Sequence, residues 1–301
     1  MKIGFALPVS GSWATPDTIA HVAGRAEELG YHSLWTFSRL LSPVDGSWGE
    51  MYRSVHDPLV TLGYAAAVTR RARLGVAVVN LPFVTPVLLA KQSTTVDILS
   101  GGRLDLGLGL GWADEEFVAS DVSKRGQGRR ADEFIAVLKA LWTDDVVSHE
   151  GERFRVPAAR MEPKPVQRPH PPILLGGTVP AALRRAGRLT DGWVSSSRAD
   201  LDRIGESIEI VRAAAAEAGR DPAALRFVCR GVVRVGDAET PRRRLMGTIE
   251  QIASDLEPIA AQGITELFVD LNFDPRIGSP DADADESRRR ADEVLDALAP
   301  H

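Results

Sequence analysis

The sequence predicts an α/β protein, a (β/α)8 TIM barrel formed as a single domain by residues 1–301, with insertions after strand two and before strand five. Short apolar runs alternate with helical stretches, which is typical of a parallel sheet. Eight such runs occur without a sign of a second domain. The 301 residues exceed the roughly 250 that a barrel of this kind takes. A doubly wound open sheet remains an alternative, because the sequence does not show closure.

Each expected strand is a short apolar run that leads toward a turn or a helix. The eight are Lys2–Leu7, Ser33–Phe37, Arg73–Val78, Leu104–Gly109, Ile173–Gly176, Gly192–Ser195, Phe227–Val233 and Glu266–Leu271. Seven helical segments lie between them, and a last helix is expected near Glu286–Leu298.

Helix starts are marked by prolines. Four pairs place a capping residue before a proline at the first helical position: Thr15-Pro16, Asp57-Pro58, Thr85-Pro86 and Asp221-Pro222. Val179-Pro180 is similar but lacks the polar cap. The first helix shows a one-sided apolar stripe that stops at Gly30.

Two connections are too long for simple turns. Ser38–His56 follows strand two, where the active sites of barrels are built, and its aromatic and basic residues suggest a substrate lid. Trp142–Pro172 precedes strand five and is expected to form a hairpin and an extended, proline-rich tether with a structural role.

Strand four is the most informative segment. Leucines at 104, 106, 108 and 110 alternate with Asp105 and with glycines at 107, 109 and 111. This two-residue period predicts a strand with leucines packed against helices and a bare face open to a flat ligand. Trp112 and the carboxylates Asp114, Glu115 and Glu116 follow, at the start of a helix. The glycines recur at every second residue, so they do not form a dinucleotide-binding turn.

Strand five runs into Gly176, Gly177 and Thr178 directly before the helix that starts at Pro180. Free amides at a helix start, with nothing bulky in front, can bind an anion such as phosphate, although a simple tight turn explains the same letters. Asn80 follows strand three closely and is either a polar contact or a turn former.

Composition excludes several classes of protein. The formal charge of −5 does not suggest a protein that binds nucleic acid. No apolar run is long enough to span a membrane. The lone Cys229 allows no internal disulfide, and no cluster predicts a metal. The first residues form no signal peptide, so we expect a soluble cytoplasmic protein.

Four blocks of the chain resemble the bacterial luciferase-like monooxygenase superfamily, most of all its branch that uses the deazaflavin coenzyme F420. They are RARLGVAVVNLPF, LSGGRLDLGLGLGW, EPKPVQRPHPPILLGG and AGRLTDGW. The resemblance runs from Met1 to about Pro275 and implies a homodimer with F420, or alternatively FMN, at the C-terminal face of the barrel. It also implies a non-proline cis peptide at Ala77-Val78 against the ring.

The expected cofactor-binding residues follow from these motifs and this resemblance. They are Ser38, Ala77, Val78, Asn80, Gly109, Gly111, Trp112, Gly176, Gly177 and Thr178. Asn272, after the last strand, is a further candidate contact. The basic residues Lys124, Arg125, Arg129 and Arg130 form either a solvated helix face or a partner for the acidic tail of the deazaflavin.

The chain departs from the superfamily after strand two. Many members carry an Asp-His pair there, whereas this chain has Ser38-Arg39. Neither side chain donates a proton readily near pH 7. The expected catalytic residues are therefore His56, Glu115 and Tyr52, and Glu50 is a further candidate.

Three functions remain open. The first is an F420-dependent oxidoreductase that transfers a hydride to or from a small organic substrate. The second is a two-component monooxygenase that uses reduced FMN, and the third is a barrel that binds a flavin without catalysis. The glycines of strand four argue against the third function. Glycines weaken a strand, so a protein without catalytic activity has no evident need to keep them.

Overall fold

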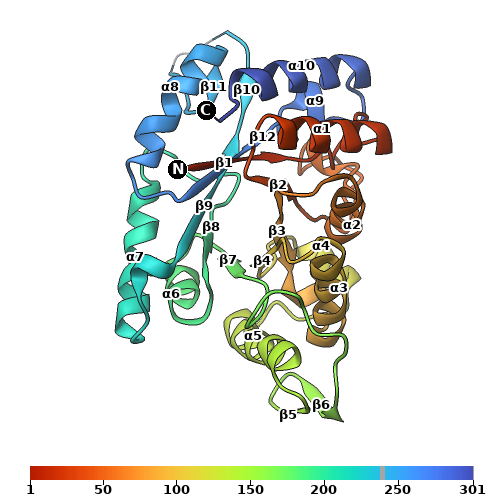
Figure 1. Ribbon diagram of the computed structural model, residues 1–301, viewed down its shortest axis with the longest axis vertical. Helices are drawn as coiled ribbons and strands as arrows, with labels where there is room; N and C mark the ends of the chain where they lie inside the picture. The colour runs from red at the N-terminus through yellow and green to blue at the C-terminus, as the bar shows by residue number, and fades with distance from the viewer. Residues whose placement is uncertain (238–240, 301) are drawn as a thin grey trace.

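The computed structural model describes residues 1–237 and 241–300, which form a closed barrel of parallel strands with helices outside (Figure 1). The barrel strands are β1 (Lys2–Ala6), β2 (Ser33–Thr36), β3 (Arg73–Asn80), β4 (Leu104–Gly109), β7 (Ile173–Gly176), β8 (Gly192–Val194), β9 (Arg226–Val232) and β12 (Glu266–Asp270). They are joined in the order β1-β12-β9-β8-β7-β4-β3-β2. The predicted (β/α)8 barrel is confirmed, each strand lies within a residue or two of its expected bounds, and an open sheet is excluded.

The helices of the outer layer are α1 (Pro16–Glu28), α2 (Pro58–Val68), α3 (Pro86–Leu99), α5 (Gln127–Thr143), α6 (Pro180–Leu189), α7 (Ile204–Glu217), α8 (Ile249–Ala260) and α10 (Ala284–Ala297), with the short α4 (Asp114–Ala119) and α9 (Pro275–Gly278). Thr15, Asp57 and Thr85 cap α1, α2 and α3 as expected, each accepting a hydrogen bond from a backbone amide three residues on. No helix in the described ranges is both long and apolar enough to cross a membrane.

The prediction that a helix starts at Asp221-Pro222 is wrong. The pair opens only a 3-10 turn, η3 (Pro222–Ala224), in which the Asp221 carboxylate accepts from the amide of Ala223. The strand β9 starts at Arg226, so no room is left for a helix. The helix of this unit is α7, which precedes the turn and has no side-chain cap at Arg203.

The two insertions differ in form. Ser38–His56 is mostly irregular, with a 3-10 turn η1 (Glu50–Tyr52). The second contains the expected hairpin, β5 (Val147–Glu150) with β6 (Arg155–Ala159), which lies beside α5 at one end of the molecule (Figure 1). A short pair between β9 and α8, β10 (Arg234–Val235) with β11 (Met246–Gly247), was not predicted.

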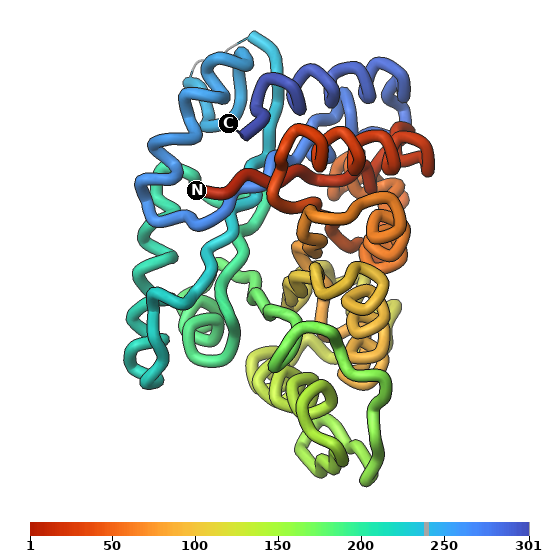
Figure 2. The backbone as a smooth tube through the Cα atoms, viewed as in Figure 1, coloured from red at the N-terminus to blue at the C-terminus, as the bar shows by residue number. Residues whose placement is uncertain are grey.

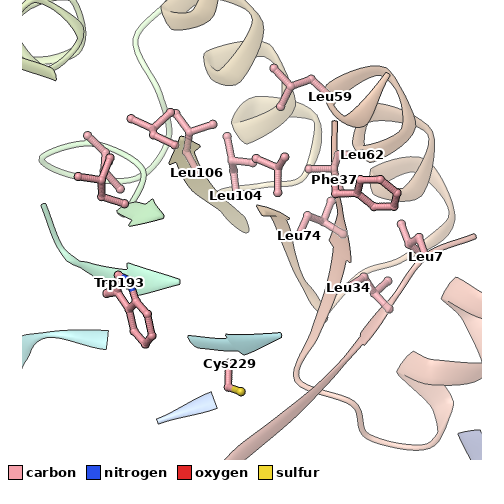
Figure 3. Close-up of a cluster of buried hydrophobic side chains, with 14 of the residues drawn as sticks. Leu7, Leu34, Phe37, Leu59, Leu62, Leu74, Leu104, Leu106, Trp193 and Cys229 are labelled. Atoms are coloured by element: carbon pink, nitrogen blue, oxygen red, sulfur yellow. The ribbon is translucent and has the colours of Figure 1, made fainter. Parts of the chain in front are cut away.

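The leucines of β4 face outward. Leu104, Leu106 and Leu108 are fully buried in the main hydrophobic core between the strands and the helices. Figure 3 shows Leu104 and Leu106 in the same cluster as Leu59 and Leu62 of α2. Burying a leucine side chain contributes roughly 1.5–3 kcal/mol, so this face holds the helical layer on the barrel.

The opposite face of β4 looks into the barrel, where a smaller apolar cluster includes Trp35 and Phe268, stacked at 5.0 Å. Asp105 on that face is fully buried. Its carboxylate accepts hydrogen bonds from Arg73 at 2.6 and 2.8 Å and from Arg226 at 2.5 and 3.0 Å. This charged cluster fills the end of the barrel opposite the carboxyl ends of the strands.

The last helix closes the outer layer beside the first. In Figures 1 and 2, α10 runs alongside α1. His21 of α1 lies 2.7 Å from Asp292 of α10, and Arg25 lies 2.7 Å from Asp296. The first and last helices of the outer layer are therefore joined by side-chain ion pairs.

Candidate active site

A cavity of about 710 Å3 lies at the carboxyl ends of the barrel strands. This is the face where barrel enzymes place their active sites, and the volume is in the range of cofactor and substrate pockets. Its walls come mainly from residues near the carboxyl ends of β3, β4, β7, β8 and β9 and from residues that follow β2, β4, β7, β8 and β12. Strand order divides the walls into a glycine-lined half, at β3, β4 and β7, and an arginine-lined half, at β2, β9 and β12.

The glycine-lined half is built around Val78. A Cβ at Gly109 would lie 2.4 Å from Val78 Cγ2, and one at Gly176 would lie 3.3 Å from Val78 Cγ1. The side chain of Val78 therefore occupies the space that larger residues on β4 and β7 would take. The result at these two positions is a smooth wall of backbone and Val78, with the side chain of Asn80 beside Gly109.

The peptide bond between Ala77 and Val78 is cis, as the resemblance predicted. The pairing of β3 with β4 shifts register at this point. Two side chains from the other half bind its carbonyls: Arg230 Nη2 donates to Ala77 O at 2.7 Å, and Ser38 Oγ donates to Val78 O at 2.6 Å. Both halves of the cavity are thus tied to the same two residues.

The helix α6 begins at the rim of the glycine-lined half. Its N-cap Val179 offers no side-chain cap, and Gly177 before it has φ of 144°, a conformation that favours glycine. Trp193 Nε1 fixes this turn by donating to Gly177 O at 2.9 Å. Gly177 and Thr178 line the cavity, so the positive end of α6 faces it.

The arginine-lined half contains a buried cation, Arg230. Its Nε lies 3.2 Å from Asp270 Oδ2, and its guanidinium lies 5.1–5.5 Å from the rings of three phenylalanines, Phe37, Phe268 and Phe273. Burial lowers the pKa of Arg230, while the charge of Asp270 opposes that shift. Arginine nevertheless stays protonated in proteins, so this wall carries a positive charge.

A second cation, Arg39, lies in an aromatic cage. Its guanidinium carbon is 5.6 Å from the ring of Trp48, 5.3 Å from that of Tyr52 and 4.9 Å from that of Trp112. Cations are attracted to the faces of such rings within about 6 Å. The side chain is only 7% exposed, and burial lowers its pKa. Arg39 also lines the cavity.

The carboxylate nearest to Arg39 is that of Glu116, which is fully buried in α4. Glu116 Oε1 accepts from the amide of Leu40 at 2.8 Å, and Oε2 lies 3.5 Å from Arg39 Nη1. Neither Oε2 nor Nη1 has a hydrogen-bond partner among the described residues. The pair is electrostatic but incompletely satisfied.

All ten residues expected to bind a cofactor line this one cavity, and Tyr52 does so as well. Their role in binding stays a prediction. His56, Glu50 and Glu115 are not among the lining residues: His56 precedes the cap of α2, Glu50 pairs with Arg53, and Glu115 faces solvent on α4. Of the three successive carboxylates Asp114, Glu115 and Glu116, only Glu116 is buried. The orientation of the short helix α4 determines which of them turns inward.

Asn272 does not reach the cavity. Its amide is fully buried and binds the backbone, accepting from the amides of Val9 and Ser10 and donating to Leu7 O. Its role is therefore structural, contrary to expectation. The four basic residues at 124–130 also lie outside the lining, and Lys124 pairs with Asp114 on the surface.

Sequence reasoning missed Arg230 and the residues of the loop after β8, among them Arg198, which also line the cavity. An arginine in the middle of an apolar strand was a signal for Arg230, since a buried cation needs a partner. Among the described residues no group of His, Cys, Asp or Glu is placed to hold a metal ion.

Comparisons with known proteins agree with this architecture. An uncharacterized protein of Mycobacterium tuberculosis is 29% identical over 99% of both chains. An FMNH2-dependent dimethylsulfone monooxygenase of Pseudomonas putida is 32% identical over 75% of this chain and 61% of its own. The solved structure of an F420-dependent secondary alcohol dehydrogenase, in complex with an F420-acetone adduct, matches with a TM-score of 0.80 at 17% identity, over 99% of each chain. The model of the luciferase-like monooxygenase family matches residues 1–299, and the chain belongs to that family.

Proposed function

We propose that this chain is an oxidoreductase that binds coenzyme F420 in the glycine-lined half of the cavity and acts on a small organic substrate in the arginine-lined half. When bound, F420 supplies a ring carbon that gives or accepts a hydride. The observation that carries the proposal is the smooth wall around Val78, which continues into the uncapped start of α6. Such a surface fits a flat ring with an anionic tail.

The residues of the wall have distinct roles in this proposal. Val78, held from both sides through Arg230 and Ser38, supports one face of the ring and leaves the other face toward the substrate. The backbone at Gly177 and Thr178 binds the phosphate of the tail, because a helix start offers free amides and a positive dipole end. The surrounding apolar side chains exclude water from the reacting atoms.

A proton must be exchanged with many carbonyl or alcohol substrates. Of the four candidate acids, Tyr52 lines the cavity, and its ring packs against Phe37, Phe273 and Trp112. A tyrosine hydroxyl both donates and accepts hydrogen bonds. We propose that the hydroxyl group of Tyr52 carries this proton, while Arg39 stays charged.

A monooxygenase that uses reduced FMN is the second candidate. The 32% identity to the FMNH2-dependent enzyme favours it. Both cofactors carry a flat tricyclic ring and a phosphate-bearing tail, so the same wall accommodates either. A barrel that binds a flavin without catalysis is the third.

Titration separates the candidates. The purified chain is titrated with F420 and with FMN by fluorescence, and oxidation of each reduced cofactor is then followed with and without oxygen. Tighter binding of F420, with turnover that needs an organic acceptor and no oxygen, supports the proposal. Preference for FMN with oxygen-dependent turnover supports the monooxygenase, and binding without any turnover across a substrate panel supports the third candidate.

A variant tests the wall itself. A Cβ at Gly177 would lie 2.5 Å from the Cβ of Ala182, so Gly177→Val should push the start of α6 out of place and weaken F420 binding by about tenfold or more. The matched control is Gly63→Ala in α2, where a Cβ meets nothing within 4 Å. Unchanged affinity in a folded Gly177→Val protein would place the cofactor elsewhere.

A further inference from the structure

Among the residues that line the cavity, three are cationic and none is acidic. The cations are Arg39, Arg198 and Arg230, and the described lining contains no aspartate, glutamate, lysine or histidine. The carboxylates that balance two of them, Glu116 and Asp270, are fully buried and do not line the cavity. A ligand in the arginine-lined half therefore meets positive charge.

Each of the two buried arginines donates one side-chain hydrogen bond to the described residues. Arg230 Nη2 is committed to Ala77 O, so this guanidinium holds the backbone of the opposite wall. Arg39 uses only Nε, which donates to Ser38 O at 2.9 Å, within the described residues. Its Nη1 is buried against Glu116 Oε2, 3.5 Å away, and its Nη2 makes no hydrogen bond to the described residues. An unused donor of a buried cation costs free energy unless a ligand or water accepts from it.

The surroundings of Arg39 favour an organic body beside the anion. Trp48, Tyr52 and Trp112 enclose the guanidinium, and Phe37 and Phe273 line the same half. Aromatic walls bind flat or apolar groups, while a guanidinium presents its donors in a planar fork that matches a carboxylate.

We propose that Arg39 is the substrate-anchoring residue of this cavity and that the substrate is a small organic acid, whose carboxylate accepts a hydrogen bond from Nη2 of Arg39. The apolar body of the acid lies between the aromatic side chains and the cofactor wall. This assignment rests on the proposed function only in that the arginine-lined half is the substrate side.

The assignment also explains the position at which the chain departs from its family. Where the resemblance leads one to expect an Asp-His pair, this chain has Ser38-Arg39. A histidine can exchange a proton, whereas an arginine keeps its charge and anchors an anion. The change therefore replaces proton transfer at this place by recognition of charge, and it leaves proton exchange to Tyr52.

Binding of benzoate and of its neutral counterpart benzamide tests the assignment. Both have the same size and ring, and quenching of tryptophan fluorescence follows binding, since Trp48 and Trp112 contact Arg39. The natural chain should bind benzoate on the order of tenfold more tightly than benzamide, because a charge-assisted hydrogen bond distinguishes them. In Arg39→Gln the preference should disappear, and in Arg39→Lys it should persist in weaker form.

Three controls keep the result interpretable. Arg212→Gln removes another arginine that lies over an aromatic ring and pairs with a glutamate, but on α7, and it should leave the preference intact. Because Arg39→Gln leaves Glu116 buried without its cation, the double variant Arg39→Gln/Glu116→Gln serves if the single variant does not fold. Titration with F420 and FMN is repeated on each variant.

The outcomes separate the two proposals. Loss of the benzoate preference in Arg39→Gln, with cofactor affinity within about twofold of the natural chain, supports the anchor. Equal binding of benzoate and benzamide by the natural chain overturns it, as does an unchanged preference in the double variant. Loss of cofactor binding in Arg39→Gln overturns it too and assigns Arg39 to the cofactor. Failure of both cofactors to bind the natural chain refutes the proposed function instead.

Discussion

The charged cluster inside the barrel makes a quantitative prediction about stability. In Asp105→Asn the side chain keeps its size and loses its charge. The carboxylate now accepts two hydrogen bonds from Arg73 and two from Arg226. The amide of asparagine has one acceptor oxygen. Its NH2 group is a donor and would face the guanidinium donors of Arg73 and Arg226, to which it cannot hydrogen-bond.

The magnitude follows from what the two arginines retain. Removing one partner of a buried ion pair costs about 3–5 kcal/mol. Arg226 keeps Glu266 at 2.9 Å, and Arg73 keeps Gln167 and the carbonyl of Leu104. Both arginine side chains are about a quarter exposed, at 23% and 25%, so water also solvates them. We therefore expect the lower end of the range, about 3 kcal/mol.

Unfolding in urea at pH 7 measures this loss. The control is Glu209→Gln, which removes an exposed carboxylate 2.8 Å from Arg212 on α7. Exposed pairs contribute about 0–1 kcal/mol, so the control should be close to the natural chain. A loss in Asp105→Asn no larger than in the control would refute the view that the interior charges stabilise the barrel.

The same pair of proteins tests the dependence on pH. Burial would raise the pKa of Asp105, but hydrogen bonds from Arg73 and the charge of Arg226 lower it below its ordinary value. A lowered pKa in the folded state gives a stability contribution that is present above the unfolded pKa, about 3.9, and lost as pH falls through the folded value. The difference between the natural chain and Asp105→Asn should thus be constant from pH 5 to 7 and shrink below about pH 4. A difference that grows on acidification would show the opposite sign of shift.

Three further predictions concern single buried groups. Burial raises the pKa of Cys229 to about 12, so a thiol reagent at pH 8 should modify it only after unfolding. Burial would raise the pKa of Asp255, but hydrogen bonds that include those from Arg242 hold it at about 2. The variant Asp255→Asn should therefore be about 1–3 kcal/mol less stable than the natural chain, as measured by thermal melting at pH 7. Asn272→Leu leaves the amide of Val9 without its acceptor and should lower the melting temperature by several degrees, whereas cofactor affinity by titration should not change.

The outer layer of the fold was predictable because its signals are local and repeated. The leucine–glycine alternation of β4 assigned one face to the helices and one to the interior, and the Thr-Pro and Asp-Pro pairs located the starts of α1, α2 and α3. Asp221-Pro222 shows the limit of such signals. A capping pair starts a turn, and the distance to the next strand decides whether a helix follows.

The site was predictable where it consists of strand ends. Gly109, Asn80 and Gly176 end neighbouring strands, so closure of the barrel brings them together without further information. Glu116 and the cage around Arg39 depend instead on how an irregular insertion folds over α4. No period in the sequence encodes that packing, so the sequence does not show which carboxylate of α4 is buried beside Arg39.

The arrangement of charge in the cavity has a consequence for selectivity. Glu116 and Asp270 neutralise Arg39 and Arg230 from behind, so the barrel holds both cations in its interior without a large net charge. The described lining on the ligand side contains the guanidinium groups and no carboxylate. Such a site favours an anion over a neutral ligand, because only an anion makes a charge-assisted hydrogen bond with Arg39 Nη2, and it penalises a cationic ligand by direct repulsion. Selectivity for an anion thus comes from three guanidinium groups in a described lining that contains no carboxylate, two of them balanced by carboxylates that a ligand in the cavity does not meet.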